Sequence, residues 1–248
     1  MNFLRPPKLL VTLLMLSFLP SQVLDVRAQQ SGNVARLVVW QSKPGMAREL
    51  EEGYKRHLGW HRQNGDSWTW HGWTIISGER VGYFVDGTFF HAWSDLDSPV
   101  SPAADAADNA VNVFAYGEVR SAAVYEAVPA LTNLGTQQLG SPLLTLCYFD
   151  VQPGRAAEFE SLLGAELRST RWSATKYALL RPANGVTAYL LLLPAEKQSD
   201  FAMQAEFTSR LLQALARNAK STPLIDRFRT ETARYRPDLS YAPSEKPK

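Results

Sequence analysis

Two short stretches of the sequence decide the fold: LVVWQSKPG at residues 37–45 and LCYFDVQPG at residues 146–154. They superpose without gaps at an offset of 109 residues. Each is a run of mostly apolar residues followed by a Pro-Gly turn, which predicts a strand that ends in a tight turn. A repeat at a fixed offset indicates that one structural unit has been duplicated within the chain.

The similarity continues into the segment after each turn. At the same offset, Ala47, Glu49, Leu50, Glu51 and Leu58 match Ala156, Glu158, Phe159, Glu160 and Leu167. Apolar residues at helical spacing predict a helix in both copies, over residues 46–63 and 155–170. Because a strand, a turn and a helix match together, the duplication does not depend on a single Pro-Gly coincidence.

Each copy is predicted to run strand, helix, strand, strand, helix, strand. The first copy places these elements at residues 36–41, 46–63, 67–77, 81–92, 102–114 and 118–128, and the second at 143–151, 155–170, 173–181, 186–193, 200–219 and 228–235. Asn184-Gly185 between two apolar runs is a strong hairpin signal. The predicted organisation is a first repeat at 34–131, a Gly- and Gln-containing linker at 132–141, a second repeat at 142–240 and a tail at 241–248.

This element order is that of a ferredoxin-like α+β unit, whose antiparallel sheet carries both helices on one face. The other face of each sheet must also be covered. Two units in one chain can cover each other by packing sheet against sheet. The predicted fold is therefore α+β, with two tandem ferredoxin-like βαββαβ repeats packed as an intrachain dimeric α+β barrel.

At this point the sequence resembles the dimeric α+β barrel superfamily. That superfamily includes the antibiotic-biosynthesis monooxygenases, the NIPSNAP and EthD-like proteins, and the duplicated chlorite dismutase group. The resemblance covers about residues 34–240 and rests on the element order and on the Pro-Gly-x-Ala entry into each first helix. It implies a fold, whereas function has to be argued from a site.

Composition and charge exclude several classes of protein. The chain has 26 Lys and Arg against 24 Asp and Glu, and without its first 28 residues both counts are 23. A neutral chain lacks the basic surplus that nucleic-acid binding requires, so we expect no nucleic-acid partner. With 45% hydrophobic and 20% charged residues, the composition is that of a globular protein and not of a disordered chain or a coiled coil.

The amino terminus reads as an export signal over residues 1–28. Arg5 and Lys8 form a basic start, residues 9–20 are apolar, and Val26-Arg27-Ala28 is a small-x-small cleavage site. The alternative is a membrane anchor, but the apolar run of about twelve residues is shorter than the roughly twenty that a spanning helix needs. We therefore expect a periplasmic or extracellular protein, cleaved near Ala28, with no membrane span in the mature chain.

The only cysteine, Cys147, rules out an intrachain disulfide, although an exported protein meets an oxidising compartment. A hydrophobic core must therefore hold the fold together. Cys147 stands in the apolar run at residues 143–149, which predicts a buried structural residue and not a reactive thiol.

Histidine and tryptophan are distributed unequally between the copies. All four histidines lie in the first copy, and so do six of the seven tryptophans; the only tryptophan of the second copy is Trp172. Core filling alone does not predict this bias, because both copies need a similar core volume. A ligand site is therefore expected in the first copy.

Two of the histidines share the apolar face of the first predicted helix. His57 and His61 fall in one narrow band with Leu50 and Tyr54, and their Cβ atoms would be about 5–6 Å apart. The equivalent positions of the second copy are Glu166 and Thr170. Buried polar side chains need partners, so we expect a polar cavity or a hydrogen-bond network near the end of this helix.

A metal site is the competing interpretation of this pair. The residues between His57 and His61 are Leu58, Gly59 and Trp60, so the His-Glu-x-x-His signature is missing. The sequence prediction is therefore a structural or capping role for the pair and no metal.

On the predicted hairpin, alternation places His71 and Trp73 on one sheet face and Trp68 and Trp70 on the other. His91 is predicted to share the face of Phe89. Which of the two faces lines the barrel interior is left open by the sequence.

The candidate ligand-binding residues are Trp40, Tyr54, His57, His61, His71, Trp73 and His91. The predicted function is an exported protein that binds a small apolar or aromatic molecule in a His/Trp-rich pocket of the first repeat. The oligomeric state is left open. The chain carries no Gly-x-Gly-x-x-Gly, Walker A, Gly-x-Ser-x-Gly or Cys-x-x-Cys motif, so nucleotide-dependent, serine-hydrolase and thiol-redox chemistry lack their usual signatures.

The alternative function follows from the resemblance. Members of that superfamily use the space between sheet and helices for aromatic substrates or haem. This implies a monooxygenase-like or haem-associated enzyme in which His57 or His61 is an axial ligand or a general base. The chain departs from the chlorite dismutase group, whose haem histidine belongs to the second copy, and from the small haem-degrading members, whose first strand carries an asparagine where Gln41 is the nearest amide.

Overall fold

A computed structural model gives the structure of residues 32–168, 172, 174–218 and 222–243. The predicted signal peptide at residues 1–28, Thr170 and residues 244–248 of the predicted tail lie outside the described residues. Among the described helices, none combines the length and the apolar character that crossing a membrane requires.

The predicted order of elements is confirmed in both repeats. The first repeat consists of β1 (Val34–Ser42), α1 (Ala47–Gln63), β2 (His71–Ser77), β3 (Phe84–His91), α2 (Pro102–Asn112) and β4 (Gly117–Thr132). The second consists of β5 (Leu143–Val151), α4 (Ala156–Leu167), β6 (Ala178–Asn184), β7 (Tyr189–Ala195), α5 (Asp200–Asn218) and β8 (Ile225–Tyr235). Short helical turns lie at Trp93–Asp97, Thr136–Leu139 (α3) and Pro237–Leu239.

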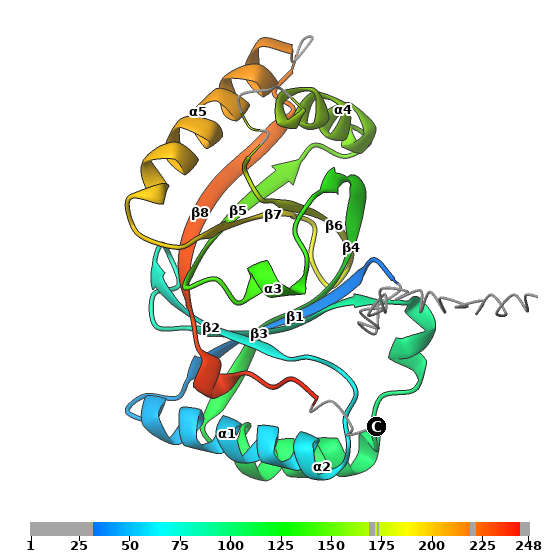
Figure 1. Cartoon of the computed structure of the whole chain (residues 1–248), viewed down its shortest axis with the longest axis vertical. Coiled ribbons are helices and arrows are strands. Elements are labelled where there is room, and N and C mark those ends of the chain that lie inside the picture. The colour runs from blue at the N-terminus through cyan, green and yellow to red at the C-terminus, as the bar shows by residue number, and fades with distance from the viewer. Residues whose placement is uncertain (1–31, 169–171, 173, 219–221, 244–248) are drawn as a thin grey trace, which may run out of the picture.

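The eight strands form one closed antiparallel barrel in the order β1-β3-β2-β8-β5-β7-β6-β4. Each repeat supplies four neighbouring strands, and the repeats are hydrogen-bonded to each other where β2 pairs with β8 and β4 pairs with β6. Helices α1 and α2 cover the outside of the first sheet, and α4 and α5 cover the outside of the second (Figure 1). The predicted intrachain dimeric α+β barrel is therefore confirmed, and each of the eight described strands pairs with a neighbour on both sides.

Alternation along each strand divides the core into an inner and an outer layer. On β1, Leu37 and Val39 face the barrel interior, whereas Val38 and Trp40 pack beneath α1. Cys147 on β5 is buried in the layer beneath α4 and α5, as expected of a structural cysteine.

The same alternation settles the orientation of the hairpin. His71 is stacked on Trp73, with ring centroids 5.6 Å apart, and Trp73 belongs to the barrel interior. Trp68 and Trp70 lie with the helices on the outer side of the sheet.

The prediction that His91 shares the face of Phe89 is wrong. Phe90 has a φ of +64°, and the register of β1 with β3 shifts between Val34 and Arg36. This β-bulge inserts one residue, so His91 turns to the outer side of the sheet, where it hydrogen-bonds Thr88 and lies 4.4 Å from the ring of Trp68. A single irregular residue therefore moves a histidine from one layer to the other.

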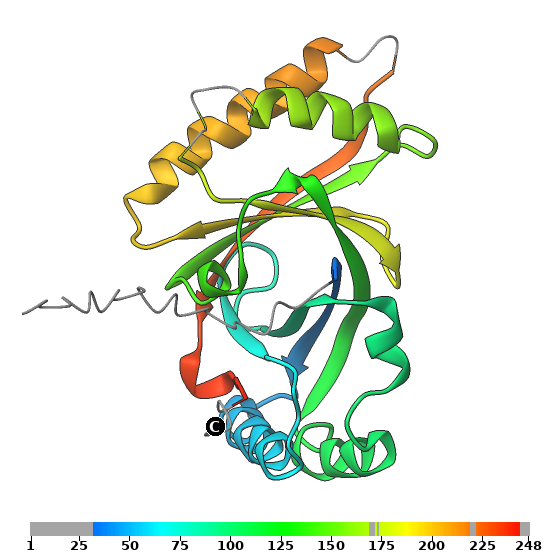
Figure 2. The ribbon, with the colours of Figure 1, turned by 45° about the vertical axis from the view of Figure 1, so that its right-hand side comes forward.

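The segment predicted as a linker at residues 132–141 is part of the core. It contains α3, which lies across one opening of the ring (Figures 1 and 2), and its side chains Leu134 and Leu139 are buried in the inner cluster. One end of the barrel is thus closed by the connection between the repeats.

The predicted tail is also ordered at its start. Tyr241 is buried and forms a two-way backbone bridge with Trp70, with N···O distances of 2.8 Å in both directions. The chain after β8 therefore returns to the first repeat and packs beside α1.

A buried ion pair joins the two repeats inside the barrel. The carboxylate of Glu231, on β8, has no solvent exposure. Arg80, in the turn between β2 and β3, donates to Glu231 Oε1 at 2.9 Å and to the Tyr148 hydroxyl at 2.7 Å. Removal of the guanidinium would leave an uncompensated charge in the barrel wall.

We expect Arg80→Met to lower the free energy of unfolding by about 3 kcal/mol, because Glu231 then loses its counter-charge. The double variant Arg80→Met with Glu231→Leu should recover most of that loss, since neither charge remains. Chemical denaturation of the three proteins measures both values. A loss below about 1 kcal/mol in the single variant, or an equal loss in the double variant, would contradict this account of the pair.

Candidate metal centre

His57 and His61 lie between α1 and α2, on the outer side of the first sheet. Their exposures are 5% and 4%, and their Nε2 atoms are 3.1 Å apart. Helix α1 continues to Gln63, so both histidines are on regular helix, one turn apart. The expectation that they point inward as a pair is met.

The two helices approach each other very closely. A Cβ atom at Gly53 of α1 would lie 1.8 Å from the backbone oxygen of Asn112 at the end of α2. Only glycine permits this contact. The contact brings the acidic face of α2 against the imidazoles of α1.

Asp105 of α2 completes a group of three ligand atoms. Its Oδ1 is 3.4 Å from Nε2 of His57 and 3.7 Å from Nε2 of His61. Together with the 3.1 Å between the imidazoles, these separations place a common centre about 2.0 Å from each atom. That radius is the length of a Zn–N or Zn–O bond, so the three atoms are already spaced as ligands of one ion.

The other nitrogen of each imidazole faces a carboxylate. Nδ1 of His57 is 2.8 Å from Asp108 Oδ2, and Nδ1 of His61 is 2.8 Å from Asp66 Oδ2. Each carboxylate favours the tautomer that carries its proton on Nδ1 and leaves the Nε2 lone pair free. The Asn109 amide lies beside these atoms, with its Nδ2 3.0 Å from His57 Nε2 and 3.4 Å from Asp105 Oδ1, and a cation between the three atoms would take over this donor's role.

The supporting carboxylates are themselves held in place. Asp66 accepts from Trp70 Nε1 at 2.8 Å and from the backbone NH of Trp68 at 3.0 Å. Although burial acts to raise it, the pKa of Asp66 lies below its usual value because His61 and the two tryptophan NH groups hydrogen-bond the carboxylate. Burial, in turn, lowers the pKa of His57, which favours the neutral imidazole that a metal requires.

A fourth position beside the three atoms is less enclosed. The amide Nδ2 of Asn109 lies 3.0 Å from His57 Nε2, and the side chain of Asp105 is 34% exposed. Rotation of the Asn109 amide would present its oxygen at this point. The arrangement therefore offers three protein ligands and one position for water, the amide or an exchangeable ligand.

The candidate residues of the sequence analysis are divided by the first sheet. Trp40, Tyr54, His57 and His61 share the outer layer, and His91 joins that layer through Trp68. His71 and Trp73 lie in the barrel interior instead, and neither ring nitrogen of His71 has a hydrogen-bond partner among the described residues. Burial lowers the pKa of His71 to about 4, so that imidazole is neutral.

The histidines do not fit haem. An axial imidazole needs a flat, open space in front of Nε2 for the macrocycle. The Nε2 atoms of His57 and His61 face each other instead, with Asp105 beside them. His71 is enclosed by aromatic rings, with Trp73 at 5.6 Å and Tyr235 at 6.1 Å between centroids.

Sequence reasoning missed the acidic residues of this centre. Asp105 and Asp108 stand three apart on a predicted helix and share one of its faces, which was the available signal. Nothing local, however, indicates that this face meets the histidines of α1. Asp66, just after α1, carries no recognisable motif.

No protein-family model matches the chain, and no curated protein matches it in sequence. Solved structures do share its fold. An anthrone oxidase-like protein aligns with a TM-score of 0.55 at 10% identity over 87% of this chain and 95% of that chain. A candidate monooxygenase from Lactobacillus acidophilus NCFM aligns with a TM-score of 0.54 at 9% identity over 85% and 96%.

A variant of the chlorite dismutase from Candidatus Nitrospira defluvii gives a TM-score of 0.52 at 12% identity over 84% of this chain and 93% of that chain. At such low identity these similarities show the fold alone. The chain has the tandem dimeric α+β barrel fold seen in these monooxygenase-like and chlorite dismutase structures.

A further buried carboxyl, Asp86, lies beneath α1. It is 5% exposed, and its Oδ2 accepts from Trp40 Nε1 at 2.9 Å. Burial raises the pKa of Asp86 to about 6, against the effect of the Trp40 and Tyr54 hydrogen bonds. The carboxyl of Asp86 therefore stays neutral to a higher pH in the folded protein than in the unfolded chain.

This shift makes stability depend on pH. A carboxyl with a raised pKa in the folded state contributes its full stability below pH 4, and that contribution is lost as the pH rises through about 6. Relative to Asp86→Asn, the wild type should lose about 2 kcal/mol between pH 4 and pH 7. Urea unfolding at a series of pH values measures the free energy of unfolding of both proteins. If the two free energies change with pH in parallel, this assignment is wrong.

Proposed function

We propose that the chain is an exported protein that binds one divalent transition-metal ion through His57, His61 and Asp105. One observation carries the proposal: two Nε2 atoms and a carboxylate oxygen converge at ligand spacing, while a carboxylate oxygen lies 2.8 Å from the opposite nitrogen of each imidazole. Export is supported by the signal-like residues 1–28.

The donor set indicates which metals fit. Two imidazole nitrogens and one carboxylate oxygen suit Zn²⁺, and three protein ligands with one remaining position are typical of a catalytic zinc site. The same donors hold Fe²⁺ in non-haem oxygenases, so Fe²⁺ is the second candidate. A bound ion of either kind would act as a Lewis acid at the fourth position.

Aromatic side chains give this centre a dry surrounding. The ring of Trp70 is 5.3 Å from that of His61, and Tyr241 stacks against the same imidazole at 6.3 Å. A poorly hydrated shell strengthens the attraction between the ligands and a cation. On this proposal, the tryptophan-rich layer keeps water away from the bound ion. The sequence prediction instead assigns it to a pocket for an apolar ligand.

The proposed function predicts that the protein binds one metal ion. Titration of the metal-free protein with Zn²⁺ in a calorimeter should show one saturable site, and Co²⁺ should give visible d–d bands at the same stoichiometry. His61→Ala or Asp105→Asn removes a ligand and should weaken binding by more than about 100-fold. His91→Gln, which changes a histidine of the same layer outside the centre, should bind as the wild type does.

Failure of the wild type to bind Zn²⁺, Co²⁺ or Fe²⁺ would overturn the proposal. Equal binding by His61→Ala and the wild type would equally exclude this centre as the site.

The proposed function also predicts a role for Asp108, whose carboxylate faces Nδ1 of His57. Asp108→Asn leaves all three ligands in place but weakens the support of the Nδ1 proton. It should lower Zn²⁺ affinity by about 10- to 100-fold, which is the usual effect of losing such a partner. Asp97→Asn, at an exposed acid outside the centre, is the matched control, and competition with a coloured chelator measures both. An unchanged affinity in Asp108→Asn would remove Asp108 from the centre.

A further inference from the structure

We propose that the open end of the barrel binds a small ligand with one negative charge and a flat apolar body, such as an aromatic carboxylate. This site lies inside the barrel and shares no residue with the metal centre. It therefore goes beyond the proposed metal function and can succeed or fail independently of it.

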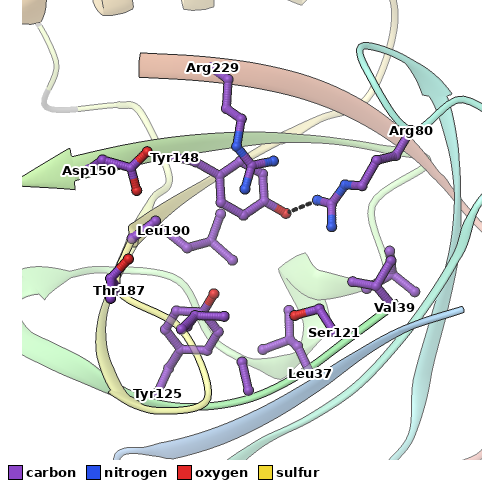
Figure 3. Close-up of a pocket in the computed structure, with 14 residues that line it drawn as sticks. Leu37, Val39, Arg80, Ser121, Tyr125, Tyr148, Asp150, Thr187, Leu190 and Arg229 are labelled. Atoms are coloured by element: carbon purple, nitrogen blue, oxygen red, sulfur yellow. Dashed lines mark hydrogen bonds between the residues drawn. The ribbon is translucent and has the colours of Figure 1, made fainter. Parts of the chain in front are cut away.

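A cavity of about 200 Å³ opens at this end (Figure 3). Leu37, Val39 and Tyr125 of the first repeat form one wall, and Leu190 of the second repeat lies opposite. An apolar protein cavity of about 150 Å³ accommodates benzene, so a single aromatic ring fits this space. The other end of the barrel is closed by α3 with Leu134 and Leu139, which leaves one way in.

The guanidinium groups of Arg80 and Arg229 lie on the second-repeat side of the cavity, and they differ in their pairing with carboxylates. Arg80 is neutralised by the buried Glu231. Arg229 lies over the ring of Tyr148, with its Cζ 3.8 Å from the centroid, and it forms no ion pair with a carboxylate of the described residues. Arg229 therefore keeps its charge and its N–H donors available toward the cavity.

The alternation of side chains along β8 explains why Arg229 points into the barrel. On β8, Arg229, Glu231 and Ala233 alternate with residues that face outward, and Ala233 belongs to the inner cluster. The residue opposite Arg229 on β5 is Tyr148. Stacking on this ring fixes the guanidinium without using its hydrogen bonds.

Polar groups around the cavity limit the ligand to one negative charge. Asp150 lines the cavity on the side away from Arg80 (Figure 3), and it would repel a second anionic group. Ser121 and Thr187 supply hydroxyls at the rim. A carboxylate on Arg229 with its ring between Leu37 and Leu190 satisfies the charge and the apolar walls together.

Calorimetric titration with benzoate tests the proposal, with benzamide as the neutral isostere and phthalate as the dianion. Benzoate should bind at one saturable site. Benzamide should bind roughly tenfold or more weakly because it lacks the charge-assisted hydrogen bond to Arg229, and phthalate should also bind more weakly because Asp150 repels its second carboxylate. Arg229→Gln should reduce benzoate affinity by a similar factor. Arg234→Gln, on the outward face of the same strand, should not change it.

A second variant keeps the test decisive if Arg229→Gln does not fold. Ser121→Phe fills the cavity at a half-buried position and leaves every charge in place, so it should also abolish benzoate binding. The metal-centre variant His61→Ala should bind benzoate normally, which separates failure here from failure of the metal proposal. Equal affinity for benzoate and benzamide, or undiminished binding by Arg229→Gln, would overturn the inference.

Discussion

The closure of eight strands into one ring is the constraint on which the rest of the structure depends. Once β2 pairs with β8 and β4 with β6, every strand has two neighbours, and each side chain is assigned either to the interior or to a helix layer. The buried Arg80–Glu231 pair lies across one of these junctions. Both proposed sites follow from this division, because the first sheet separates the helix layer that holds His57 and His61 from the barrel interior, where Arg229 and Tyr148 lie.

Much of the fold could be predicted from the duplication, because the strand, the Pro-Gly turn and the helix are local patterns that occur twice. The position of His91 could not, since the bulge at Phe90 is one residue with a left-handed backbone and has no periodic signature. The candidate metal centre could be predicted only in part. The spacing of His57 and His61 placed them together on α1, but Asp105 reaches them only through the packing of α2, and the absence of a His-Glu-x-x-His motif led to the prediction of no metal. Long-range packing of this kind leaves no trace in a single sequence.

The two repeats show how one unit can serve two purposes. At the position equivalent to His57, the second repeat has Glu166, which accepts from Trp172 Nε1 at 3.1 Å and forms a local polar pair. Around it the second helix layer is filled by Phe159, Leu163 and Phe207. The helix layer of the second repeat is thus largely apolar, whereas the helix layer of the first contains buried histidines and carboxyls. A stable half can support a half whose buried charges lower its own stability.

The close approach of α1 and α2 at Gly53 bears on how the centre would exchange its ion. Because Gly53 has no side chain, the two helices can touch, and the three ligand atoms are already spaced to bind one ion. Apolar packing and strand pairing maintain this fold. The site is preorganised, so an ion that enters has little conformational work to do and one that leaves does not unfold the domain. The fraction of protein with bound metal would then depend on the metal concentration around the folded protein, and not on whether metal was present while the chain folded. A reversible metal receptor behaves in this way.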